Sequence, residues 1–153
     1  MDRRQFILSG LATGLTLTGQ FATAGGGMVC ATDGVALDGF DSVSYFAPGG
    51  PVPGRRDIAL MWKGATWYFA THRHRDMFEA KPRALSPRYG GYCALDMTQG
   101  RLSRGSPQSW QVAQGRLYLI RDETAHAAWQ RDMAGNIARA DAHWPAALRQ
   151  QQS

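Results

Sequence analysis

The sequence predicts an α+β fold in which a small antiparallel sheet of two β-hairpins packs with one short central helix and with C-terminal helices. Two pairs of apolar runs, each joined by a two-residue turn ending in glycine, predict the hairpins. Apolar residues at helical spacing near the end of the chain predict the terminal helices. Hairpins on both sides of a helix, followed by further helices, indicate the α+β class.

The two hairpins are recognised by their strands and by their turns. Residues 57–62 and 65–70 form the first predicted pair of strands, and residues 109–113 and 116–120 form the second. The turns are Lys63-Gly64 and Gln114-Gly115. Glycine at the second turn position is typical of the tight turns that join antiparallel strands.

The helices are predicted from their capping residues and their apolar spacing. Thr71 is a good N-cap for a helix over residues 72–81, and Pro82 ends it because proline cannot continue the backbone hydrogen bonding. Residues 122–143 repeat apolar side chains at helical spacing, with an interruption expected near Ala134-Gly135. The last part of the domain is therefore predicted to be helical.

The first 24 residues are predicted to be a twin-arginine signal peptide. Arg3 and Arg4 precede an apolar run diluted by glycine and threonine, and the run ends in Ala22-Thr23-Ala24, a small-x-small cleavage pattern. An ordinary Sec signal is the alternative. The run is too short and too polar to compete well as a spanning helix. We expect export to the periplasm, with no stable membrane anchor after cleavage.

The remainder is predicted to be one domain with short ends. Residues 25–33 read as a flexible lead, residues 34–146 as the domain, and residues 147–153 as a polar C-terminal tail. The signal holds two of the 17 basic and one of the 12 acidic residues, so 15 and 11 remain and the net charge is +4. The basic residues are scattered and form no run, which argues against a nucleic-acid partner.

The order of motifs along the chain resembles that of a known family, the exported YHS-domain proteins. The similarity begins with Ala36-Leu37-Asp38-Gly39-Phe40-Asp41, continues to Phe46, and extends to about residue 146. Its further segments are residues 62–69, 75–82, 89–94, 115–119 and 135–145. The resemblance covers nearly the whole mature domain. It implies family membership more strongly than it implies a function, since much of this family is uncharacterised.

The resemblance implies metal association, but the expected cysteines are absent. Shorter YHS modules carry a Phe-Cys-x-x-x-Cys-x-x-x-Phe pattern, which aligns here on Phe69 and Phe78 and places Ala70 and His74 at the cysteine positions. Another position that is often cysteine is Ser44. The soft thiolate set that selects Cu(I) or zinc is therefore missing from its usual place.

A different set of possible metal ligands remains. Cys93 and Met97 are four residues apart, so they share a face if this stretch is helical, and His74 is the one member of the family pattern that can still ligate. Thiolate, thioether and imidazole suit a copper ion, and iron is the other metal considered. The alternative is that Cys93 and Met97 are simply core residues, because both types are often buried.

Aromatic residues around a glycine-rich loop are the best candidates for a binding pocket. Residues 87–93 combine two tyrosines with Gly90-Gly91. Tyr45, Tyr89 and Tyr92 carry the family pattern around this loop, and we predict that they form a pocket wall.

A disulfide between Cys30 and Cys93 is a further alternative. It would close a loop of about 60 residues and stabilise the fold by roughly 3–4 kcal/mol on the chain-entropy model. It would also remove the thiolate ligand, so the bridge and the metal site exclude each other.

The sequence as a whole predicts an exported YHS-type module that binds a transition metal, copper or iron, without turning over a substrate. The leading alternative is a metal-free module that docks an unknown periplasmic protein. A cysteine-dependent enzyme using Cys93 with His74 comes third, because no third residue stands out to orient such a pair.

Overall fold

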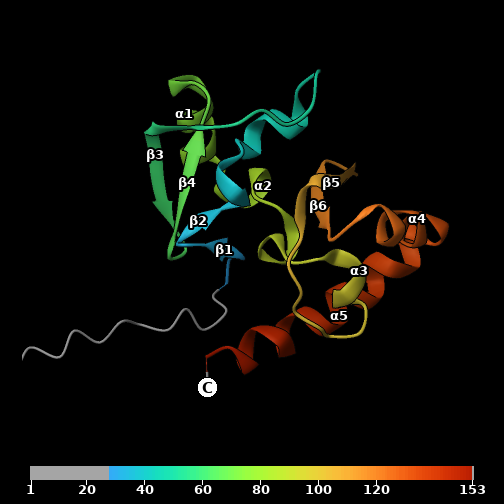
Figure 1. Cartoon of the computed structure of the whole chain (residues 1–153). Helices are drawn as coiled ribbons and strands as arrows, with labels where there is room; N and C mark the ends of the chain where they lie inside the picture. The colour runs from blue at the N-terminus through green and yellow to red at the C-terminus, as the bar shows by residue number, and fades with distance from the viewer. Residues whose placement is uncertain (1–27, 153) are drawn as a thin grey trace, which may run out of the picture.

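The computed structural model describes residues 28–152, so the predicted signal peptide, residues 1–24, lies outside the described residues. The α+β class is confirmed, since the described chain holds two small sheets together with helices. Figure 1 shows the first sheet on one side of the molecule and the second hairpin with the C-terminal helices on the other.

The first sheet contains the first predicted hairpin and two short strands, one from the predicted lead and one from the start of the predicted domain. Its strand order is β1-β2-β4-β3. β1 pairs antiparallel with β2, β3 pairs antiparallel with β4, and β2 lies parallel to β4. The strands are β1 (Ala31–Thr32), β2 (Val35–Ala36), β3 (Arg55–Trp62) and β4 (Ala65–Phe69). The sheet is therefore mixed, and the parallel contact was not anticipated from the sequence.

The second hairpin forms a sheet of its own. It consists of β5 (Ser106–Ala113) and β6 (Arg116–Ile120), which pair antiparallel. Both predicted turns are present. Lys63 and Gly64 have φ values of 48° and 75°, and Gln114 and Gly115 have values of 52° and 71°. Positive φ at both turn positions matches the right-handed twist of the strands and explains the glycine in each turn.

The central helix begins where its cap predicts. α1 (His72–Ala80) follows Thr71, whose hydroxyl accepts a hydrogen bond from the backbone N–H of His74 at 3.1 Å. Pro82 ends this helix as predicted, and it is also the first residue of α2 (Pro82–Leu85), a position that proline tolerates because no backbone N–H is needed there.

The C-terminal helices extend further than the sequence predicts. α4 (Glu123–Arg131) and α5 (Met133–Gln150) are separated at Asp132, two residues before the expected interruption. Asp132 accepts a hydrogen bond from the backbone N–H of Gly135 and so caps the start of α5. α5 continues through Pro145, and the segment predicted as a polar tail is helical to Gln150, with Ala147 buried.

The core is divided into two hydrophobic clusters that meet at β6. Leu117 and Leu119 belong to the cluster formed with the first sheet and α1, whereas Tyr118 and Ile120 belong to the cluster formed with the C-terminal helices. Alternate residues of a strand point to opposite faces, so β6 is covered on both. This explains why its sequence is apolar without alternation. Among residues 28–152, no helix is long and apolar enough to cross a bilayer.

Candidate functional site

Two of the predicted metal ligands lie deep in the second cluster. Cys93 is the N-cap of α3 (Ala94–Met97), and neither Cys93 nor Met97 has any exposed surface. The backbone N–H of Arg121 donates a hydrogen bond to the Cys93 sulfur at 3.4 Å. Burial raises the pKa of the Cys93 thiol above its ordinary value, which disfavours the thiolate.

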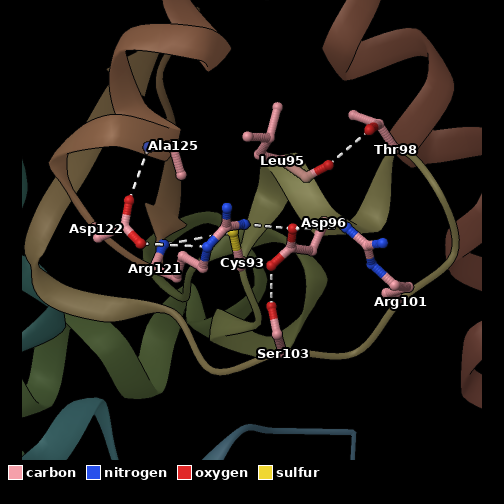
Figure 2. Close-up of polar contacts among 9 residues, drawn as sticks. All are labelled: Cys93, Leu95, Asp96, Thr98, Arg101, Ser103, Arg121, Asp122 and Ala125. Atoms are coloured by element: carbon pink, nitrogen blue, oxygen red, sulfur yellow. Dashed lines mark hydrogen bonds and ion pairs between the residues drawn. The ribbon is translucent and has the colours of Figure 1, made fainter.

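The charged side chains next to Cys93 form hydrogen bonds and ion pairs with one another. Figure 2 shows the Asp96 carboxylate between the hydroxyl of Ser103 and the guanidinium of Arg121, with hydrogen bonds to both. Arg101 approaches the same carboxylate at 3.3 Å. Burial raises the pKa of Asp96, but the hydrogen bonds from Ser103 and Arg121 outweigh it, and the pKa lies below its usual range. This carboxylate is an internal anchor for the loop after α3.

The third predicted metal ligand, His74, lies elsewhere. Its Nδ1 contacts the Oδ2 atom of Asp41 at 2.6 Å, at the start of α1. Asp41 is fully buried and also accepts backbone N–H groups from Val43 and Ala70, each at 2.9 Å. These contacts tie the turn before the first hairpin to the entrance of α1. They give His74 a structural role beside the first cluster.

The structure therefore does not bring the predicted metal ligands together. Cys93 and Met97 belong to the second cluster, and Figure 1 shows α1 and α3 on different sides of the molecule. The described residues contain no group of three histidine, cysteine or acidic side chains that could hold an ion. The residues present do not fit a three-ligand site, and the same separation leaves the alternative Cys93–His74 catalytic pair without geometric support.

The three predicted pocket tyrosines have different surroundings. Tyr45 is buried in the first cluster, where its hydroxyl donates to the backbone oxygen of Pro107 at 2.9 Å. Tyr92 packs its ring against Trp144, with the ring centres 6.4 Å apart. Only Tyr89 of the three lines a cavity of useful size. The predicted wall is thus reduced to one of its members.

That cavity is a cleft of about 480 Å³. It collects side chains from the turn between β3 and β4, from α2, from the glycine-aromatic loop, from β6 and from α5. Its lining residues are Met28, Val29, Trp62, Lys63, Trp67, Arg83, Ser86, Pro87, Arg88, Tyr89, Gly90, Arg116, Trp144 and Leu148. Volumes of about 300–1,000 Å³ with aromatic walls and a few polar groups are typical of small-molecule sites.

The glycine-aromatic loop shapes one side of this cleft. Tyr89 and Gly90 adopt φ values of 55° and 62°. A Cβ atom at Gly90 would lie 2.0 Å from the backbone oxygen of Met28, so only glycine allows the N-terminal segment to pack here. The backbone N–H of Cys30 donates to the oxygen of Gly90 at 2.8 Å and fixes this approach.

The cleft is lined by four basic side chains and by no acidic side chain, histidine or cysteine. Arg88 is paired with Asp141 on α5 at 2.9 Å, and the hydroxyl of Tyr89 donates to the same carboxylate. Lys63, Arg83 and Arg116 take part in none of the ion pairs found among residues 28–152. Three cations therefore face one cleft without a carboxylate of their own.

Lys63 shows the electrostatic effect of this gathering. Its Nζ atom lies over the ring of Trp62, 4.6 Å from the ring centre, which is a cation–π geometry. The pKa of Lys63 is lowered, first by burial and then by the positive charge of Arg83. Burial and the nearby charge of Arg83 both disfavour the charged form of Lys63, whereas a bound anion would favour it.

Neither cysteine forms a disulfide in the structure. Cys30 is partly buried and Cys93 is fully buried, and both are free thiols. Burial raises the pKa of the Cys30 thiol as well. The predicted alternative of a Cys30–Cys93 bridge is therefore not what the structure contains.

Comparison with known proteins adds no identity. No family model, no curated protein and no solved structure matches the chain. The resemblance to YHS-domain proteins accordingly stays a prediction from the motifs. The sequence does not reveal the cleft because three of its basic residues lie far apart along the chain. Lys63 and Arg83 are 20 positions apart, and Arg83 and Arg116 are 33 positions apart. Only the fold brings them together.

Proposed function

We propose that the mature protein is an exported binding module that holds a small organic molecule in the cleft and does not turn it over. The observation that carries the proposal is the cleft itself, about 480 Å³ in volume and walled by aromatic and basic side chains from both halves of the fold. Concave sites built in this way bury most of the surface of a small ligand.

The composition of the lining favours binding over catalysis. General acid–base chemistry needs a histidine, a carboxyl group or a similar titrating side chain within hydrogen-bond reach of the substrate. The lining residues include no histidine and no carboxyl group, and their two hydroxyls, those of Ser86 and Tyr89, have no such base beside them in the lining. The cleft can bind and orient a molecule; Lys63 and Tyr89 are its titrating side chains, and the Tyr89 hydroxyl is already engaged by Asp141.

The export signal and the family resemblance belong to the same proposal. The twin-arginine pattern of Arg3 and Arg4 supports delivery of a folded domain to the periplasm, where a binding module would meet its ligand. The metal reading draws no support from the arrangement of Cys93, His74 and Met97. Elemental analysis of natively exported protein tests it directly, since stoichiometric copper or iron would restore it.

The proposal is tested by filling the cleft from within. Leu148 is half-buried on α5 and lines the cleft, whereas Ala146 is exposed on the same helix and does not. We expect Leu148→Trp to abolish binding because the larger ring occupies the cleft, and Ala146→Trp to leave binding intact. Circular dichroism and thermal melts establish that both variants fold.

Binding is measured in two ways on the mature protein purified after export. Native mass spectrometry detects a molecule that copurifies, and a thermal-shift screen with small aromatic anions and neutral analogues finds molecules that bind in vitro. A molecule retained by the parent protein and Ala146→Trp but lost from Leu148→Trp supports the proposal. Equal retention by all three proteins, or no binding in either assay, overturns it.

A further inference from the structure

We infer that the ligand of the cleft is an organic anion with a flat apolar body, its charged group lying among Lys63, Arg83 and Arg116. This inference rests on the proposed function and adds the chemical class of the ligand. It is carried by two independent features of the cleft: the unpaired cations and the partly exposed aromatic rings.

The first feature is the excess of positive charge. Like charges that line the same cleft repel one another. Arg83 is near enough to Lys63 to disfavour its charged form, and the lining offers no carboxylate to offset either. An anionic group bound in the cleft would be attracted by Lys63, Arg83 and Arg116 and would offset the repulsion among them.

Arginines outside the cleft differ from those that line it. Arg104 pairs with Asp38, Arg121 pairs with Asp96, and Arg139 pairs with Asp132. The fold thus provides carboxylates for several arginines of similar exposure. It leaves the cleft cations without one, which is the arrangement expected where the counter-charge is supplied by a ligand.

The aromatic rings define the rest of the ligand. Trp62 and Trp144 are both half-buried, so part of each ring surface is free to contact a bound molecule. Trp67 and Tyr89 lie deeper and close the wall behind them. A small inorganic anion would pair with the cations but would leave these rings uncovered. A flat ring system carrying a carboxylate, a sulfonate or a phosphate ester would use both features.

The experiment separates charge from shape with three probes. These are 2-naphthoate, its neutral isostere 2-naphthamide, and acetate, which carries the charge without the ring. Binding to the mature protein is measured by titration calorimetry and by quenching of tryptophan fluorescence. We expect 2-naphthoate to bind at least about 10-fold more tightly than the other two, and its advantage over the amide to shrink at high salt.

Single neutralising variants locate the charged group. Arg83→Gln and Arg116→Gln should each weaken 2-naphthoate by roughly 3- to 10-fold while leaving 2-naphthamide unchanged, since only the anion interacts with the lost charge. Arg56→Gln is the matched control, because Arg56 is exposed on β3 and lies outside the cleft. The substitution removes the same charge from the protein. It should change neither affinity.

The outcomes distinguish this inference from the proposed function. If the naphthoate and the amide bind equally and Leu148→Trp blocks both, the cleft binds ligands but the anion class is wrong. If acetate binds as tightly as 2-naphthoate, the apolar body is wrong. If neutral screening hits bind and the naphthoate does not, the inference is overturned. If nothing binds in a way that Leu148→Trp prevents, the proposed function fails with it.

Discussion

Two regions of the molecule hold clustered arginines, and they use them in opposite ways. Around Asp96, the guanidinium of Arg121 and that of Arg101 converge on one carboxylate that is only 7% exposed. Around the cleft, Arg83, Arg116 and Lys63 line one concave site and have no carboxylate of their own among the described residues. The residue types are the same, and the difference lies in whether the fold supplies the counter-charge.

This difference separates charges that stabilise the fold from charges that are available to a ligand. A buried carboxylate whose hydrogen bonds are all made locks its loop in place, and breaking the set leaves groups without partners. Lys63, Arg83 and Arg116 contribute little to folding, because they are exposed and gain no carboxylate partner among the described residues when the chain folds. The first region should therefore respond to mutation through stability and the second through binding.

The largest expected effect is the loss of the Asp96 anchor. Asp96→Ala should lower the free energy of unfolding by about 2–3 kcal/mol, because Ser103 and two arginines lose a shared acceptor, although both arginines can still reach water. Urea denaturation measures it. Asp57→Ala is the control, since Asp57 pairs with Arg55 at the surface with both side chains more than half exposed. An equal loss in the two variants would contradict the anchor role.

The next effect concerns Cys93, which lies beside the same network. Cys93→Ser should cost about 1–2 kcal/mol, because a hydroxyl replaces a sulfur in a fully buried site. In the parent protein, thiol titration should find Cys30 reactive without denaturant and Cys93 reactive only after unfolding. One thiol or none in the denatured, unreduced protein would show that a disulfide forms after all.

A smaller effect is expected in acid. The pKa of Asp96 is lower in the folded state than its usual value, so its ionised form stabilises the fold above the ordinary aspartate range near pH ~3.9. That contribution is lost as the pH falls through the folded pKa. The unfolding free energy of Asp96→Asn should therefore fall less steeply with acid than that of the parent protein. Parallel curves below about pH 4 would contradict this.

The smallest effect on stability is predicted for the cleft. The double variant Arg83→Gln/Arg116→Gln should change the free energy of unfolding by less than about 0.5 kcal/mol, because neither side chain belongs to an ion pair among the described residues. A gain in stability is the expected sign, since repulsion with Lys63 is removed. A loss comparable to that of Asp96→Ala would make the two regions alike.

Local chemistry explains which parts of the fold could be predicted. The two hairpin turns and the cap at Thr71 depend on a few neighbouring residues, and all three are present in the structure. The β1–β2 hairpin around Asp33-Gly34 has the same kind of turn sequence, but it lies at the junction between the predicted flexible lead and the predicted domain. The parallel contact between β2 and β4 depends on distant segments and has no local signal.

The site was less predictable for the same reason. Cys93 and Met97 do lie within one turn of α3, as their spacing suggests, and both side chains are fully buried in the second cluster. His74 faces Asp41, which no spacing rule links to it, since the two residues are 33 positions apart. The basic residues form no run in the sequence, yet three of them, Lys63, Arg83 and Arg116, line one cleft in the fold.

A crystal structure of the mature protein with 2-naphthoate would show whether the cleft cations bind the charged group of a ligand. We expect the carboxylate to lie within hydrogen-bond distance of at least one of Lys63, Arg83 and Arg116, and the ring system to lie against Trp62 or Trp144. A naphthoate bound elsewhere on the molecule, or seated in the cleft with its carboxylate turned away from all three cations, would contradict it.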